Sequence, residues 1–195
     1  VVRLQAHDGS QRNDSWCMRT KLIVNPTSGR GRSLSLLPQI ESALIQLGLE
    51  FNHEFTRAPG HAVEMAQQAV ADGFERVVAV GGDGTCHEVA NGLLTAAAPG
   101  RSAVLGLVPV GSGNDFAYAL GIPSECPAAC AILKDGSERQ IDAGRVSVDG
   151  ASRYFINFVG VGLDAAVTIK SAGVKLFRGQ AVYLWSALHS IFLGR

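Results

Sequence analysis

The sequence predicts an α/β fold built around a parallel sheet. Apolar runs typical of buried strands begin near Leu22, Phe51, Val77 and Ala103. The segments between them carry apolar residues at the spacing of an amphipathic helix. Successive runs start about thirty residues apart, the length that a strand–helix–strand unit requires, and such crossovers are right-handed. The pattern therefore predicts neighbouring parallel strands connected by helices.

Each predicted strand is followed by a loop and then by a helix. Gly48 ends the first helix and Gly73 the second, because glycine is common just after a helix C-terminus. The predicted strands are 22–24, 51–56, 77–80 and 103–108, and the predicted helices are 37–47, 61–72 and 85–97.

The two ends of the chain depart from this pattern. Residues 1–20 are polar and show no apolar period, so we expect a disordered leader. Beyond residue 137, Asp149-Gly150 is a hairpin signal that predicts antiparallel strands over 140–148 and 153–159. The expected organisation is a leader over 1–20, an α/β domain over 21–137 and a partial, truncated β-rich domain over 138–195.

Composition and charge exclude several classes of protein. The 195 residues are 47% hydrophobic and 17% charged, which excludes a disordered chain. A formal net charge of +0 argues against a protein that coats nucleic acid through bulk electrostatics. No apolar run reaches the roughly 18 residues of a membrane span. The 4 cysteines are too few for a disulfide scaffold, and no signal peptide is evident, so we expect a cytoplasmic protein with peripheral membrane contact.

The most informative segment is the Gly-Gly-Asp-Gly-Thr sequence at 81–85, which joins a buried strand to a helix. Ligands bind at this end of the strands in open α/β sheets. Glycines let a phosphate approach the backbone, and the free N–H groups of the helix attract an anion. Asp83 then suits Mg²⁺ beside the phosphate, the alternative being a turn aspartate that bonds its own backbone. Glu88 is either a ligand or forms a capping box with Thr85.

Three further loops of similar composition follow other strands. Residues 25–32 (Asn-Pro-Thr-Ser-Gly-Arg-Gly-Arg) include two arginines that can meet phosphate charge. Residues 110–116 repeat the order of strand, glycine loop and helix, with Asn114 or Asp115 suited to cap the helix. Residues 56–61 form either a ligand loop or a helix entry with Pro and Gly. Such loops on successive strand ends favour one shared phosphate site.

These loops resemble the motifs of the diacylglycerol kinase catalytic domain family, whose relatives include bacterial lipid kinases, sphingosine kinases and ceramide kinases. Residues 25–29 look like its N-P-x-S-G loop, 81–88 like its G-G-D-G-T-x-x-E segment, and 111–117 like its G-T-G-N-D-F-A segment with Ser112 in place of threonine. The resemblance covers residues 21–164. It implies a three-layer nucleotide-binding domain, similar to those of phosphofructokinases and NAD kinases, followed by the start of an antiparallel β-sandwich.

The resemblance also implies an ATP-dependent lipid kinase that phosphorylates a hydroxyl of diacylglycerol or a similar lipid at a membrane surface. ATP and Mg²⁺ are the implied cofactors, and Asp83 is the implied catalytic residue and metal ligand. The residues assigned to the nucleotide are Asn25, Ser28, Gly29, Arg30, Thr56, Gly81, Gly82, Gly84, Thr85, Glu88, Ser112 and Asn114.

Other features of the whole protein stay open in the sequence. The family's general base belongs to its second domain, so we expect that base beyond Arg195. No nucleic acid partner is expected, and a homodimer is compatible with the resemblance. The alternative functions are an NAD kinase-like small-molecule kinase and a non-catalytic nucleotide-binding fragment.

Overall fold

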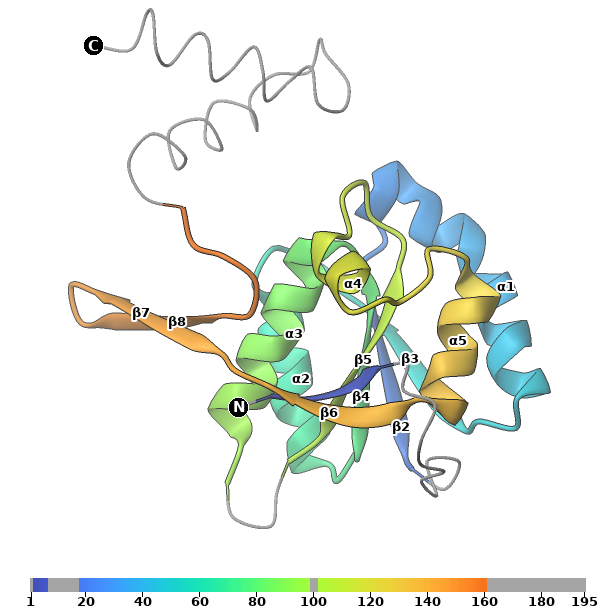
Figure 1. Ribbon diagram of the computed structural model, residues 1–195, viewed down its shortest axis with the longest axis horizontal. Coiled ribbons are helices and arrows are strands. Elements are labelled where there is room, and N and C mark those ends of the chain that lie inside the picture. The colour runs from blue at the N-terminus through green and yellow to red at the C-terminus, as the bar shows by residue number, and fades with distance from the viewer. Residues whose placement is uncertain (1, 7–17, 99–101, 161–195) are drawn as a thin grey trace, which may run out of the picture. The chain divides into compact units, whose positions relative to one another are not determined.

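The computed structural model of the chain describes residues 2–6, 18–98 and 102–160. The chain divides into two compact units, Val1–Asn157 and Phe158–Arg195. Nearly all of the described residues belong to the first unit. That unit contains a six-stranded sheet in the order β3-β2-β4-β5-β1-β6 and a separate two-stranded sheet of β7 and β8 (Figure 1). The predicted α/β class is confirmed.

The centre of the large sheet is parallel, as predicted. β2 pairs in parallel with β3 and β4, and β4 pairs in parallel with β5. Every residue of β4 and β5 is buried, as expected of apolar runs in a sheet covered on both faces. The strands of this sheet are β1 (Val2–Ala6), β2 (Thr20–Val24), β3 (Phe51–Phe55), β4 (Arg76–Gly81), β5 (Val104–Pro109) and β6 (Ser137–Ile141).

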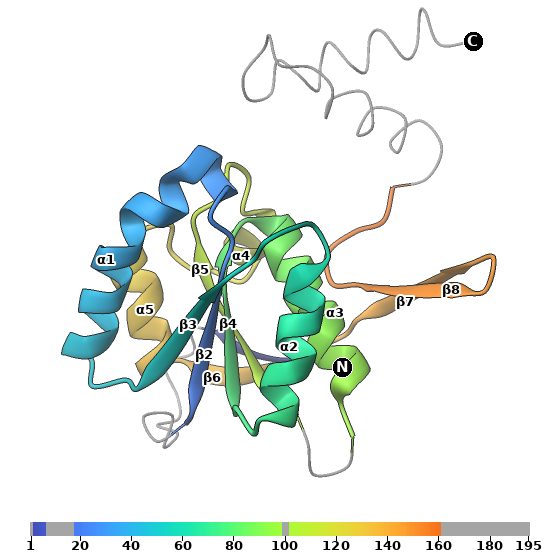
Figure 2. The same cartoon turned by 180° about the vertical axis from the view of Figure 1, so that it is seen from behind.

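Helices cover both faces of the sheet, which gives the three layers (Figures 1 and 2). Leu22 and Val24 pack with α1 and α5, whereas Ile23 between them packs with α2 and α3, because successive strand side chains point to opposite faces. Two short helices, η2 and α4, follow β2 and β5. The helices are η2 (Ser28–Gly31), α1 (Arg32–Gln46), α2 (His61–Ala71), α3 (Asp83–Ala96), α4 (Asp115–Ala119) and α5 (Cys126–Asp135).

The prediction of a disordered leader over 1–20 is wrong for Val2–Ala6, which form β1. This strand lies between β5, to which it is parallel, and β6, to which it is antiparallel. Apolar and polar residues alternate from Val2 to Ala6, which is the period of a strand, and the sequence analysis overlooked it. Residues 7–17 of the predicted leader lie outside the described residues.

The domain boundary expected at 137/138 also differs from the structure. Ser137–Ile141 form β6 on the free edge of β1, so the first unit continues to Asn157. The predicted strand 140–148 is therefore divided between β6 and β7 (Gly144–Val148). β7 pairs with β8 (Ala151–Phe155).

The hairpin signal at Asp149-Gly150 is confirmed. Both residues have positive φ, 50° and 80°, as the tight turn of a two-residue hairpin requires. The antiparallel sheet of β7 and β8 thus starts where the sequence places the β-rich region. Residues 161–195 of that region lie outside the described residues.

Candidate active site

Four loops meet at the carboxyl ends of β3, β2, β4 and β5, which are neighbours in the sheet. Backbone hydrogen bonds extend the pairing of the strands into these loops. The N–H of Asn25 donates to the carbonyl of Val80 (3.0 Å), that of Thr56 to Val24 (2.9 Å), and that of Val110 to Gly81 (2.9 Å). The loops predicted from the sequence to share one edge of the sheet do share it.

Asn25 organises the first of these loops. Its Oδ1 accepts hydrogen bonds from the backbone N–H of Thr27 (3.0 Å) and from the hydroxyl of Thr27 (2.9 Å). Its Nδ2 donates to Oγ1 of Thr85 at 3.0 Å, which links this loop to the third residue of α3. Asn25 thus holds two of the predicted ligand loops together.

Glycine allows three of the loops to touch. Gly29 has φ +57°, and a Cβ atom on it would overlap the carbonyl oxygen of Val110 after β5. A Cβ on Gly111 would overlap Cα of Gly82, so these two loops are in backbone contact. Any side chain at these points would separate the loops. Their glycine content therefore serves packing between loops as well as access for a phosphate.

Asp83 makes contacts that the sequence analysis did not foresee. Its Oδ1 accepts a hydrogen bond from the backbone N–H of Phe116 at 3.0 Å, and its Oδ2 accepts one from that of Asp115 at 3.2 Å. These are the first N–H groups of α4, so Asp83 caps that helix. The alternative of a turn aspartate bonded to its own backbone is not what the structure has. Asp83 is instead a clamp between the loops after β4 and β5.

Asn114 does not cap α4 with its side chain, although it occupies the N-cap position. Its Oδ1 accepts from the N–H of Gly111 (2.9 Å), and its Nδ2 donates to the carbonyl of Gly111 (3.1 Å). Asn114 also has φ +63°, a left-handed conformation that asparagine tolerates better than most residues. Its side chain closes the glycine loop on itself and leaves the cap to Asp83.

The capping box proposed for Thr85 and Glu88 is absent. α3 begins at Asp83 with Gly82 as N-cap, so Thr85 lies inside the helix and not at the cap. Glu88 Oε2 accepts a hydrogen bond from the backbone N–H of Ala62 at 3.3 Å, in the first turn of α2. Glu88 therefore caps the neighbouring helix and joins α2 to α3.

An open cavity of about 270 Å³ lies between the loops after β2 and β3 and the start of α3. Asn25, Thr56, Gly84, Thr85 and Glu88 are predicted site residues that line it. Arg57, which had no role assigned from the sequence, also lines the cavity and is exposed. The sequence did contain a signal for Arg57, because this positively charged residue directly follows the predicted site residue Thr56. The other lining residues are Pro26, Thr27, Ala58, Pro59 and Ala62.

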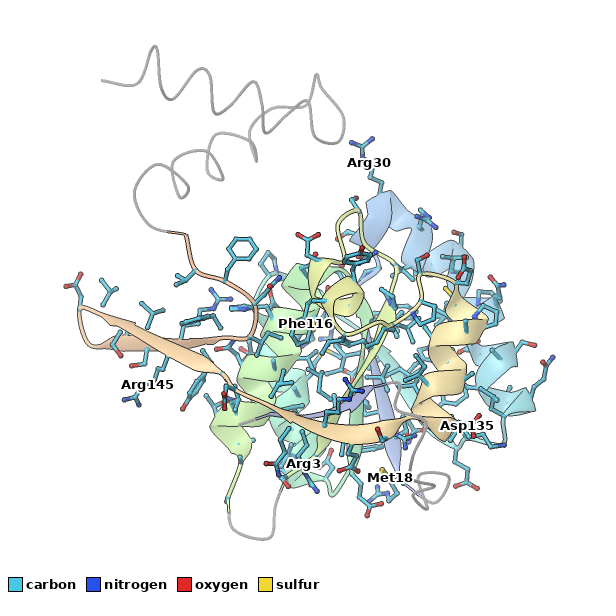
Figure 3. The ribbon with its side chains drawn as sticks, in the orientation of Figure 1. Arg3, Met18, Arg30, Phe116, Asp135 and Arg145 are labelled. Carbon is cyan, nitrogen blue, oxygen red and sulfur yellow. The ribbon has the colours of Figure 1, made fainter. Side chains whose placement is uncertain are left out.

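The remaining predicted residues lie around this cavity and not on it. Ser28 and Gly81 are buried between the loops, and Gly82 and Asn114 line a smaller cavity beside Asp83. Ser112 is exposed. The side chain of Arg30 projects away from the fold in Figure 3, at a residue with φ +61°. The structure therefore does not bring Arg30 to the cavity.

Asp83 is the sequence-predicted metal ligand, and its carboxylate lies between the loops after β4 and β5. Within residues 2–6, 18–98 and 102–160, no cluster of three or more His, Cys, Asp or Glu side chains could hold a metal. Each Asp83 oxygen accepts one N–H and retains a second lone pair. Mg²⁺ is commonly held by one or two carboxylates together with water and substrate phosphates, so Asp83 fits that ion.

The cysteine beside Asp83 is not a nucleophile. Cys86 is buried, and its burial, followed by the charge of Asp83, raises the pKa of the thiol. The thiol therefore stays protonated at neutral pH, and a protonated thiol is a poor nucleophile. Cys86 serves the packing of α3 against the sheet.

Throughout the described part of the chain, the helices are too short or too polar to cross a bilayer.

Comparisons with known proteins agree on one family. A family described as "Diacylglycerol kinase catalytic domain" matches residues 19–146. Diacylglycerol kinase from Bacillus subtilis is 39% identical over 168 residues, which cover 85% of this chain and 53% of that protein. Diacylglycerol kinase from Staphylococcus carnosus is 32% identical over 166 residues, which cover 85% of this chain and 52% of that protein. The chain thus spans about half the length of these curated relatives.

A solved structure supports the same assignment. The crystal structure of a diacylglycerol kinase from Bacillus anthracis superimposes with a TM-score of 0.53 at 30% sequence identity. The superposition covers 60% of this chain and 43% of that one.

Proposed function

The chain belongs to the diacylglycerol kinase catalytic domain family, and from that premise we propose that it transfers the γ-phosphate of ATP to a hydroxyl of diacylglycerol or a similar lipid. One observation carries this proposal above the others. The loops after neighbouring strands converge on a cavity of about 270 Å³ at the N-terminus of α3, where backbone N–H groups and the helix dipole favour phosphate.

The residues around the cavity suit different parts of ATP. Arg57 and the start of α3 at Gly84 are positive, so we assign the phosphates to that side. The Glu88 carboxylate would repel phosphate and accept hydrogen bonds from hydroxyl groups, which suits the ribose. Asn25 and Thr56 provide polar edges that orient the nucleotide. Phosphoryl transfer depends chiefly on such positioning and charge neutralisation.

Asp83 is the residue that would hold Mg²⁺. When bound, Mg²⁺ neutralises charge on the transferring phosphoryl group. The clamp from Asp83 to α4 would fix the carboxylate in place before the nucleotide binds, because both of its oxygens are anchored to backbone N–H groups. The expectations of a lipid acceptor at a membrane surface and of a cytoplasmic location remain predictions.

The test is transfer of radiolabelled phosphate from ATP to a panel of acceptors, measured with this chain and with a longer protein in which the second domain of the family follows it. The panel contains micelles of diacylglycerol, sphingosine and ceramide, together with NAD. We expect label in a lipid product and none in NAD. Label only in NADP would overturn the proposal in favour of an NAD kinase-like enzyme. Binding of Mg-ATP without transfer to any acceptor, by the longer protein as well, would favour a non-catalytic nucleotide-binding role.

Two arginines provide a matched pair for calorimetry with Mg-ATP. Arg57 and Arg30 are both exposed, but only Arg57 lines the cavity. Arg57→Ala is expected to weaken Mg-ATP binding about tenfold, the effect of losing about 1.4 kcal/mol of phosphate attraction. Arg30→Ala is expected to weaken it less, because its side chain projects away. Equal losses in the two variants would contradict the assignment of the phosphates to the Arg57 side.

A further inference from the structure

Asn91 is a buried polar residue on α3 that the proposed chemistry does not use. It is 6% exposed and lies about two turns after Asp83. Its side chain is nonetheless fully engaged. Oδ1 accepts a hydrogen bond from the backbone N–H of Tyr154 at 2.9 Å, and Nδ2 donates to the carbonyl of the same residue at 2.9 Å. Nδ2 also donates to the carbonyl of His87 at 2.9 Å.

The amide of Asn91 therefore pairs with β8 as a neighbouring strand would. One residue in an antiparallel ladder exchanges an N–H and a carbonyl bond with its partner, and Asn91 supplies both groups from a side chain. The pairing fixes the position of Tyr154 on the helix and allows no shift along it. A substitution that removes the amide would leave two backbone groups of β8 without these partners.

The hairpin needs such an anchor, because most of it is exposed. In β7 every residue after Gly144 is exposed, and in β8 only Tyr154 and Phe155 are partly buried. An isolated two-stranded hairpin is marginally stable in water. Ile156, just after β8, packs against the core on the α2 and α3 side. The hairpin is thus attached to the fold at its base, where Asn91 meets Tyr154.

This attachment lies one turn of helix from the cavity. His87 and Glu88 precede Asn91 on α3, and Glu88 lines the cavity. Burial, followed by the positive charge of Arg153 on β8, lowers the pKa of the His87 imidazole. The contact of α3 with β8 therefore follows directly, along the helix, its contact with the nucleotide cavity.

We propose that Asn91 is a positioning residue for phosphoryl transfer, which holds hairpin β7–β8 in a fixed register on α3, one helical turn from the nucleotide cavity. The inference rests on the proposed kinase function. An acceptor hydroxyl must approach the γ-phosphate to about 3–3.5 Å in a set orientation. A hairpin that is attached about one helical turn from the cavity and shifts along α3 would spoil that orientation without weakening nucleotide binding. The loss should therefore appear in kcat for the lipid and not in the affinity for ATP.

The test uses a protein in which the second domain of the family follows this chain, with Asn91→Ala, Asn91→Asp and a control, Thr95→Ala. The Asp variant keeps the acceptor for the Tyr154 N–H but loses both donated bonds. Thr95 lies one turn further along α3, where its hydroxyl bonds helix carbonyls and Gln67 and not the hairpin. The measurements are amide hydrogen exchange at Tyr154, calorimetric affinity for Mg-ATP, and kcat and KM for diacylglycerol in micelles.

We expect the Tyr154 amide to exchange about 10- to 100-fold faster in Asn91→Ala, since two hydrogen bonds and their desolvation are at stake. In Asn91→Asp exchange at Tyr154 should be intermediate. Both variants should keep Mg-ATP affinity within about twofold while kcat falls about tenfold or more, and Thr95→Ala should change neither quantity. If kcat is higher in Asn91→Asp than in Asn91→Ala, in the same order as the protection of the Tyr154 amide, the loss of the anchor and the loss of kcat are linked.

Unchanged exchange at Tyr154 in Asn91→Ala would overturn the anchor. Faster exchange with unchanged kcat would overturn the positioning role, as would equal losses of kcat and ATP affinity, which indicate general destabilisation. A wild-type chain that protects Tyr154 but phosphorylates no lipid would contradict the proposed function and the catalytic part of this inference, while the anchor itself would stand. The two failures are therefore distinguishable.

Discussion

Removal of the Asp83 carboxylate is the perturbation that separates its two roles most clearly. The sequence assigns Asp83 to Mg²⁺, whereas the structure shows it capping α4 through Asp115 and Phe116. Asp83→Ala removes both functions. Asp83→Asn keeps one carbonyl oxygen as an acceptor but loses the charge. Comparison of the two variants therefore reports how much each function contributes.

The expected cost to stability follows from the two hydrogen bonds. A bond from a backbone N–H to a charged acceptor contributes about 1.5–3 kcal/mol, and loss of a helix cap costs about 0.5–2 kcal/mol. Asp115 is exposed and Asp83 is half-buried, so water replaces part of the lost interaction. We expect Asp83→Ala to lower the free energy of unfolding by about 2 kcal/mol, and Asp83→Asn by about half as much. Urea unfolding measures both values.

Calorimetry with and without Mg²⁺ then isolates the metal role. If Asp83 binds the metal, both variants lose affinity for Mg-ATP, and the difference from wild type disappears when EDTA removes the metal. If Asp83 acts only as a clamp, the loss of affinity is the same in both conditions. Substitutions at neutral surface positions change the free energy of unfolding by no more than about 0.5 kcal/mol. A change as small as this in Asp83→Ala would refute the clamp.

Three further predictions concern stability. Gly29→Ala should lower the free energy of unfolding by about 1–3 kcal/mol, because its φ is positive and its Cβ would overlap a carbonyl; Gly31→Ala, with positive φ but open space, should cost less in the same urea experiment. Glu88→Ala should cost about 1 kcal/mol through the lost cap on α2, and Glu88→Gln, which keeps an acceptor, should cost less; equal losses would contradict the cap. Burial raises the pKa of the Cys130 thiol from 9.0 to about 12. Between these pH values the thiol is ionised in the unfolded chain but stays protonated in the folded one. The contribution of this thiol to stability is complete below pH 9.0 and decreases as pH rises towards 12; a Cys130→Ala variant should lack this part of the pH dependence, and an identical slope would contradict the shift.

Elements with strong local patterns could be predicted from the sequence. β4 and β5 are largely apolar runs, and glycine marks the ends of α1 and α2, so both strands, α2 and the end of α1 were predicted to within a residue or two. The start of α1 was missed, because the helix begins at Arg32, five residues before the first apolar residue of the predicted helix, Leu37. Their order also placed the loops at one edge, because parallel strands present their carboxyl ends together. β1 carried the same kind of signal in its alternating residues and was still missed, because the polar residues after it dominate that end of the sequence.

Contacts between distant residues could not be predicted in the same way. The partners of Asp83 lie on α4, the partner of Glu88 lies on α2, and the partner of Asn91 lies on β8. Each of these polar side chains has a local alternative that the sequence suggests equally well, a metal ligand or a cap on its own helix. Tertiary packing decides among them, because a buried polar group must find a partner wherever the fold provides one.

The loops after β2, β3 and β4 line one cavity, which we propose to be a single nucleotide site. An NMR titration of the isotopically labelled chain with Mg-ATP tests it most directly. We expect the largest amide shifts to occur together, at one affinity, in residues 25–29, 56–59 and 82–86, which line the cavity or adjoin its lining residues. Shifts confined to another part of the chain, or separate affinities for the three segments, would contradict it.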